Sequence, residues 1–132
     1  MKITVDTNIL VRAVLEDDRK QAKAAIKLLR DATLIAVPLA SLCELVWVLK
    51  RGAGLARDDI VRAIEALSAA HNAVMNRKAV EAGLAVFAAG GDFADGIIAY
   101  EGRWLGGDDF VSFDKSAVKL LKEQGRRARL LA

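Results

Sequence analysis

The chain has 132 residues, of which 54% are hydrophobic, so one domain over residues 1–132 can bury a full core without disulfides or a structural metal. Cys43 is the only cysteine, which favours a reducing compartment, and no apolar run approaches the ~20 residues that cross a bilayer. The net charge of +3 is compatible with a nucleic-acid partner but too small to indicate one. We therefore expect a cytoplasmic protein with no membrane partner.

Short β-prone runs alternate with amphipathic helical patterns along the chain. The pattern predicts strands at residues 2–5, 33–37, 73–75, 110–113 and 128–131. It predicts helices from residue 9 onward and over 18–32, 39–50, 57–70, 78–89, 93–105 and 115–123. Strands joined by helices form parallel sheets through right-handed crossovers. We therefore predict an α/β fold, a three-layer α/β/α sandwich with a mainly parallel central sheet of about five short strands.

Four acidic residues end or interrupt apolar segments. Asp6 follows the first strand, and Asp114 follows the strand at 110–113. Glu44 lies within the apolar helix at 39–50, and Asp95 lies in the first turn of the helix at 93–105. Ligands of open parallel sheets bind at the carboxyl ends of the strands. We expect Asp6 and Asp114 at that edge, with Asp95 and Glu44 brought there by their helices.

Carboxylates that meet in one pocket repel each other unless a cation compensates them. Zinc is disfavoured, because His71 and Cys43 are the only residues of their kinds. Ligands that offer only oxygen favour Mg²⁺ or Mn²⁺, as one or two ions. Such ions activate water and neutralise the charge that builds up in phosphoryl displacement. This chemistry points to phosphodiester hydrolysis.

Helix capping is a structural alternative for these acids. Asp6 and Asp114 each precede a predicted helix, where an aspartate commonly caps. Asp95 could stabilise its helix through the dipole, and capping is the role we prefer for its neighbour Asp92. Ser41 and Glu44 have the spacing of a capping box, although the helix pattern starts earlier.

Several segments resemble the PIN domain, and most closely the VapC-type toxins of toxin–antitoxin pairs. They are VDTNIL at 5–10, LCELVWVL around Glu44, DFADGIIA at 92–99 and VSFD at 111–114. The resemblance runs the length of the chain. It implies a metal-dependent endoribonuclease that forms a homodimer, cleaves RNA and is inhibited by a cognate antitoxin protein.

The resemblance also assigns roles to residues. The family's acidic quartet matches Asp6, Glu44, Asp95 and Asp114. Asp6 and Asp95 would be the firmest metal ligands, and the other two would complete the pocket directly or through water. Polar residues beside the quartet would orient a carboxylate or a water; they are Asn8, Ser112 and, unless its hydroxyl only caps, Thr7.

Two positions depart from the family pattern. Gly96 stands where the family usually has a larger residue, commonly Ala, which predicts a looser start of that helix. Ser112 replaces the commoner Thr but keeps the hydroxyl.

The sequence gives little information about which residues contact the substrate. Basic side chains could hold RNA phosphates, although a solvated helix surface is the alternative for each of them. The candidates are Arg12, Lys50, Arg51, Arg103 and Lys115. The cluster Arg126, Arg127 and Arg129 could meet RNA or an acidic antitoxin segment, or protect an edge strand. We expect Trp47 and Trp104 in the core or a dimer interface rather than stacked on bases.

Two other enzyme or signalling classes fit less well. A haloacid-dehalogenase-like phosphatase needs a second Asp two residues after the first, where this chain has Asn8. A receiver domain needs an acidic acceptor after the third strand, where this chain has Asn76. A PIN-like module that binds RNA or protein without cutting remains an open alternative.

Overall fold

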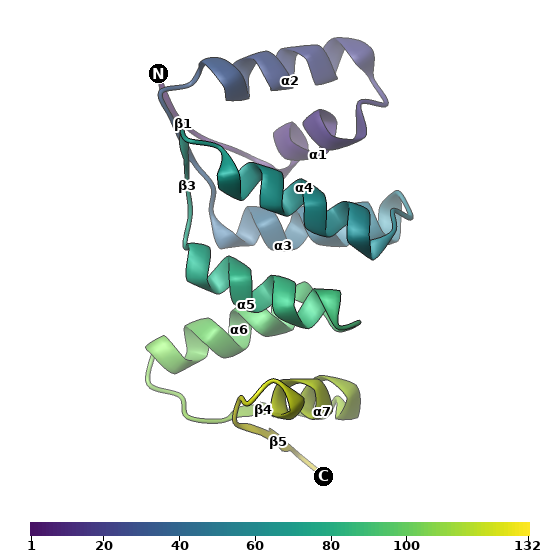
Figure 1. Cartoon of the computed structure of the whole chain (residues 1–132), viewed down its shortest axis with the longest axis vertical. Coiled ribbons are helices and arrows are strands. Elements are labelled where there is room, and N and C mark those ends of the chain that lie inside the picture. The colour runs from purple at the N-terminus through teal and green to yellow at the C-terminus, as the bar shows by residue number, and fades with distance from the viewer. The chain divides into compact units, whose positions relative to one another are not determined.

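The computed structural model describes residues 1–132 as two units, Met1–Asn76 and Arg77–Ala132. The chain contains seven α-helices and five strands, and every strand pair is parallel. Figure 1 labels most of these elements along the chain. Each unit has its own sheet and its own helices. That residues 1–132 act as one domain stays a prediction.

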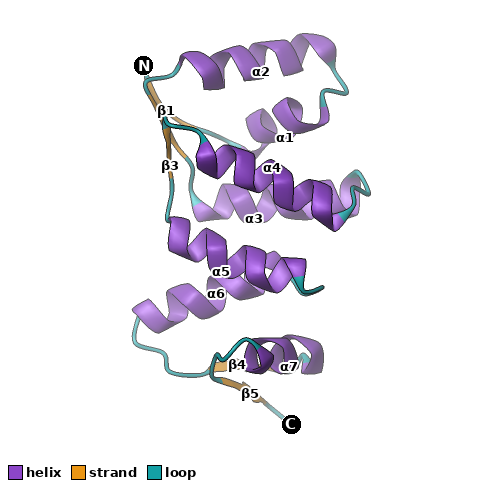
Figure 2. Ribbon diagram, viewed as in Figure 1, coloured by secondary structure: helices purple, strands orange, loops and turns teal.

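The first unit is a parallel sheet of three short strands with four helices. Its elements are β1 (Lys2–Thr4), α1 (Thr7–Leu15), α2 (Arg19–Asp31), β2 (Leu34–Ala36), α3 (Leu39–Trp47), the π-helical turn η1 (Val48–Gly52), α4 (Arg57–Ala69) and β3 (Ala73–Val74). The strand order is β1-β2-β3, with Ile3 paired to Ile35 and Ile35 paired to Ala73. Figure 2 shows the strands gathered at one side of this unit and the helices extending from them.

The core of the first unit follows the apolar spacing of its helices. Leu42, Leu45 and Leu49 lie at intervals of three and four residues, and each is at most 1% exposed. Ile60 and Ile64 of α4 are fully buried at the same spacing. Apolar side chains repeated at this interval fall on one face of a helix, so α3, η1 and α4 each have a buried face.

The second unit pairs two strands and packs two helices closely. Its elements are α5 (Arg77–Ala88), α6 (Phe93–Trp104), β4 (Phe110–Ser112), α7 (Lys115–Glu123) and β5 (Ala128–Leu130). β4 and β5 are parallel, with Val111 opposite Arg129. α5 and α6 meet at glycines, since a Cβ on Gly96 would lie 2.5 Å from the carbonyl oxygen of Ala82.

This close approach corrects our interpretation of Gly96. We expected the glycine to loosen the start of its helix, but it is buried where α6 lies against the backbone of α5. A Cβ on the facing Gly83 would in turn lie 2.8 Å from Phe93 Cε1. The missing side chains let the two helices approach, so Gly96 fixes the position of α6.

The predicted elements are confirmed, with ends that differ by a few residues at most. The α/β class and the parallel strands are confirmed as well, but the strands form a sheet of three and a sheet of two where we expected one central sheet. Strands of two or three residues contribute few ladder hydrogen bonds. The alternation of elements therefore predicts their order and direction but not how many sheets they form.

The two tryptophans are not core residues. Trp47 is 65% exposed and Trp104 is 76% exposed, so the expectation that they fill the core is wrong. Trp47 follows Leu45 and Val46 on α3 but points away from the buried face, and Trp104 is the last residue of α6. A dimer interface for either residue stays a prediction. None of the helices has the length and apolar character needed to span a membrane.

Candidate active site

Asp6 lies directly after β1 and caps helix α1. Its Oδ1 accepts a hydrogen bond of 2.8 Å from the backbone N–H of Thr7. The carboxylate is exposed and forms no ion pair, so its second oxygen stays open to a ligand. Capping and metal binding are therefore compatible at Asp6, because one carboxylate has two oxygens with several lone pairs.

Thr7 links Asp6 to Glu44. Its hydroxyl donates a 2.8 Å hydrogen bond to Glu44 Oε2, while its backbone N–H donates to Asp6. The Thr7 side chain is buried at 7% exposure, whereas Glu44 is exposed on α3. One buried threonine is thus hydrogen-bonded to two acids of the quartet. That Thr7 orients a carboxylate for metal binding stays a prediction.

The capping-box interpretation of Ser41 and Glu44 is wrong. Helix α3 begins at Leu39, two residues before Ser41, with Pro38 as its N-cap residue. The Ser41 hydroxyl instead donates a 3.1 Å hydrogen bond to the carbonyl oxygen of Val5. This bond ties α3 to the chain directly before Asp6, so it helps to place Glu44 near that residue.

Replacing Thr7 with valine should lower RNA cleavage by about tenfold while changing the melting temperature little. Outer-sphere partners that orient metal ligands contribute about 10- to 100-fold to affinity or activity. Glu44 is exposed and can bind water when the hydroxyl is lost, so the unfolding free energy should change by at most about 1 kcal/mol. Cleavage rates and Mn²⁺ affinity measured for Thr7→Val and Thr7→Ser test this. Thr7→Ser keeps the hydroxyl and should therefore retain the wild-type cleavage rate and Mn²⁺ affinity. Losses of the same size in Thr7→Ser and Thr7→Val would contradict the role of the hydroxyl.

The second unit holds the other two acids of the quartet. Asp114 caps α7, where its Oδ1 accepts from Ser116 N at 2.9 Å and from Ala117 N at 3.2 Å. Ser112 Oγ accepts a 3.0 Å hydrogen bond from the backbone N–H of Asp114. Ser112 therefore fixes the main chain at Asp114, which is one way to orient its carboxylate.

Asp95 lies in the first turn of α6 and is half-buried. The preceding Asp92 caps this helix by accepting from Ala94 N at 2.9 Å, as expected. Burial raises the pKa of the Asp95 carboxyl, and the negative charges of Asp92 and then Asp114 raise it further. The Asp95 and Asp114 carboxylates therefore repel each other within this unit. A bound cation would relieve the repulsion.

Asp95→Asn should raise the thermal stability of the metal-free protein at pH 7. The carboxyl has a higher pKa in the folded state than its ordinary 3.8, so its ionisation opposes folding. The loss of folding free energy that this ionisation causes is absent below the unfolded-state pKa and fully present above the raised folded-state pKa. The stability gain of the variant should therefore disappear as the pH falls toward 4. Melting curves in EDTA between pH 4 and pH 8 measure it, and a variant less stable than wild type at pH 7 would contradict the assignment.

The quartet thus occurs as two pairs, one in each unit. Thr7 joins Asp6 to Glu44, and Asp95 lies within electrostatic range of Asp114. Neither unit by itself gathers three or more side chains of the types that hold a metal. The donor chemistry nevertheless fits a hard divalent cation, because all four groups are carboxylates. That the pairs act at one metal centre stays a prediction.

The remaining candidates are less closely tied to the acids. Asn8 is exposed in the first turn of α1, and Lys115 is exposed directly after Asp114. Arg12 is half-buried and forms a 3.2 Å ion pair with the exposed Asp17.

Three other basic candidates lie at helix ends. Lys50 and Arg51 lie in η1, at the far end of α3 from Pro38. Arg103 lies in the last turn of α6. Asp95 and Arg103 are eight residues apart on this helix, a separation of about 12 Å along its axis. Substrate binding by these residues stays a prediction.

Comparison with known families gives a direct assignment. The model of the PIN domain matches residues 3–120, which include all four acids and span both units. The chain therefore belongs to the PIN-domain family, which is a family of nucleases that generally use divalent metal ions. No curated protein matches the sequence.

Proposed function

We propose that this protein is a metal-dependent endoribonuclease and the toxin of a toxin–antitoxin module. The observation that carries the proposal is a complete acidic quartet whose members form no ion pair in a chain of the PIN family. Structural acids are normally paired or fully solvated, whereas Asp95 is half-buried beside other acids. Uncompensated carboxylates at the ends of strands and the starts of helices suit a cation site.

Asp6 and Asp95 are the proposed direct ligands of one or two Mg²⁺ or Mn²⁺ ions, with Glu44 and Asp114 completing the site directly or through water. When bound, such ions supply water activation and neutralise charge on the phosphate that is displaced. The chain's own contribution is to position the carboxylates. Thr7 holds Asp6 and Glu44, and the backbone amides at the start of α7 hold Asp114.

The toxin role, the homodimer and the cognate antitoxin are proposed from the segments that resemble VapC-type toxins. Exposed apolar side chains offer surface for a second subunit, since Trp47 and Trp104 are largely uncovered. We place the activity in the cytoplasm, where RNA is available and Cys43 would stay reduced. The proposed substrate is RNA, which the protein cuts within the strand.

RNA cleavage tests the proposal directly. The purified protein is incubated with RNA in Mg²⁺, in Mn²⁺ and in EDTA, as wild type and as Asp6→Asn. We expect internal cleavage that needs the metal and is lost in Asp6→Asn, whose folded state is preserved because asparagine also caps helices. Asp18→Asn makes the same exchange at the cap of α2 and should cleave like wild type.

If the wild type cleaves RNA as fast in EDTA as with Mg²⁺ or Mn²⁺, or if Asp6→Asn cleaves as fast as the wild type, the result would falsify the catalytic assignment. RNA binding without cleavage under all conditions would instead identify a non-catalytic PIN-like module.

A further inference from the structure

A pocket of about 520 Å³ opens in the second unit, away from Asp95 and Asp114. It is an open pocket lined by the last turns of α6, the segment that leads into β4 and the connection between α7 and β5. Arg103 lies in it about 12 Å along α6 from Asp95. Phe110 begins β4 in the pocket, whereas Asp114 follows the other end of that strand. The pocket is therefore distinct from the candidate active site, and its volume suits a small organic ligand.

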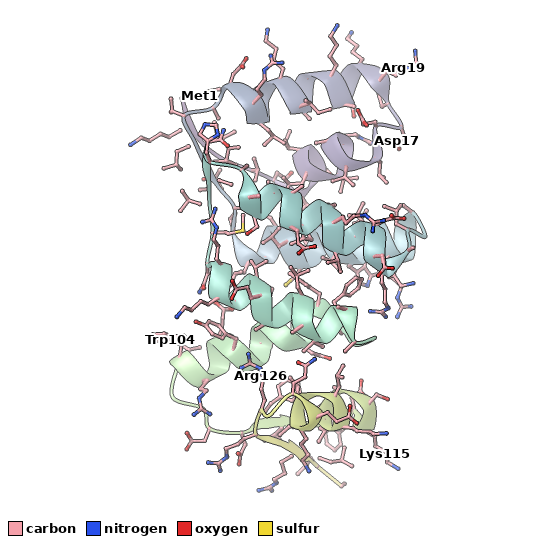
Figure 3. The ribbon with its side chains drawn as sticks, viewed as in Figure 1. Met1, Asp17, Arg19, Trp104, Lys115 and Arg126 are labelled. Atoms are coloured by element: carbon pink, nitrogen blue, oxygen red, sulfur yellow. The ribbon has the colours of Figure 1, made fainter.

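Two guanidinium groups in this pocket have no acidic partner. Arg103 and Arg126 form no ion pair, whereas Arg127 Nε is bound to Asp109 Oδ1 at 2.8 Å. Arg126 is half-buried, and its backbone N–H donates to the carbonyl oxygen of Leu121 at 2.9 Å. Figure 3 labels Arg126 below α6, and residues of both α6 and this segment line the pocket. Unpaired arginines on a fixed backbone are well suited to bind a phosphate group.

The other residues that line the pocket indicate a ligand larger than a phosphate ion. Ile98 and Phe110 provide apolar and aromatic surface, on which a nucleobase can stack. Asp108 has no ion-pair partner and can accept hydrogen bonds from ribose hydroxyls. Gly102 contributes no side chain, and a Cβ there would meet open space. The pocket thus combines sites for an anion, a sugar and a flat apolar ring.

We propose that this pocket binds a nucleotide unit, with its phosphate at Arg103 and Arg126 and its base against Ile98 and Phe110. The nucleotide is either free or the phosphorylated end of an RNA strand, since both present the same groups. A phosphate ion alone would leave most of the volume and all of the apolar wall unused. A purely apolar ligand would leave the half-buried guanidinium group of Arg126 unpaired beside it.

Calorimetric titration in EDTA and phosphate-free buffer tests the proposal without the candidate metal centre. The probes are AMP, adenosine and an RNA trinucleotide with a 5′-phosphate. AMP or the trinucleotide should bind, and adenosine should bind at least tenfold more weakly than AMP because it lacks the phosphate. Arg126→Ala should weaken nucleotide binding by about tenfold, and Gly102→Leu should also weaken it, because its side chain would occupy part of the pocket.

Arg30→Ala provides the matched control, because Arg30 is an exposed arginine of α2 in the other unit. Gly102→Leu changes no charge and places its side chain in open space, so it tests the pocket even where Arg126→Ala impairs folding. AMP binding identifies a free nucleotide, and binding of the trinucleotide alone identifies an RNA end. Absence of binding by both, or binding that neither Arg126→Ala nor Gly102→Leu reduces, overturns the proposal. Because cleavage is not measured, these outcomes are independent of the nuclease assignment.

Discussion

Asp95→Asn is expected to lower metal-dependent RNA cleavage roughly 1,000-fold, which corresponds to about 4 kcal/mol of activation free energy. Asp95 is a proposed direct metal ligand, and it is the acid whose pKa is raised by burial and then by the neighbouring negative charges. Asparagine has the same shape but no negative charge, so the metal would lose both affinity and position. Losses of 100- to 1,000-fold are typical when one preorganised electrostatic group is removed from an active site.

Single-turnover cleavage with saturating Mn²⁺ measures this loss. Asp18→Asn is the control for the replacement of an aspartate by asparagine. The same variant should be more stable than wild type in EDTA, so a loss of folding does not explain its inactivity. A variant that retains more than a tenth of wild-type cleavage would show that Asp95 is not a metal ligand.

Gly96→Ala is expected to destabilise the protein by about 3 kcal/mol, which would lower its melting temperature by roughly 10 °C. The new Cβ would lie 2.5 Å from Ala82 O and 2.8 Å from Gly83 Cα. Both are backbone atoms of α5, so neither can rotate away as a side chain would. Helix α6 must shift, and the adjacent Asp95 shifts with it.

Gly102→Ala is the control for this effect, because it makes the same exchange six residues later in α6. Its Cβ meets nothing within 4 Å, so the higher helix propensity of alanine should stabilise the protein by about 0.5 to 1 kcal/mol. Thermal and urea unfolding of both variants give the two values. Equal effects of both substitutions would show that the contact between α5 and α6 is not tight.

The helices and strands could be predicted because apolar spacing and polar ends coincide along the sequence. Helix α2 begins after Asp18, whose Oδ1 accepts from Gln21 N at 3.1 Å, and α6 begins after the capping Asp92. The division of the strands into two sheets could not be predicted, since strands this short carry little information on their partners. The exposure of Trp47 could not be predicted either, because on a mostly apolar helix the sequence does not show which apolar side chains face solvent.

The sequence singles out the four candidate acids, but it does not predict the contacts that their side chains make. The acids stand out because each ends or interrupts an apolar segment, and Asp6 and Asp114 proved to be caps as well. We treated capping and metal binding as alternatives, although one carboxylate can do both. The bond from Thr7 to Glu44 depends on how α1 packs against α3, which local sequence does not determine. The same holds for the pocket at Arg126, whose residues come from separate segments.

Mn²⁺ binding to the wild type and to four single variants tests most directly whether the acids form one metal centre. The variants are Asp6→Asn, Glu44→Gln, Asp95→Asn and Asp114→Asn, and their affinities are measured by titration with electron paramagnetic resonance detection. We expect every substitution to weaken binding, with the largest losses in Asp6→Asn and Asp95→Asn. If the substitutions in one pair leave the Mn²⁺ affinity unchanged while those in the other abolish it, the four acids do not share a centre.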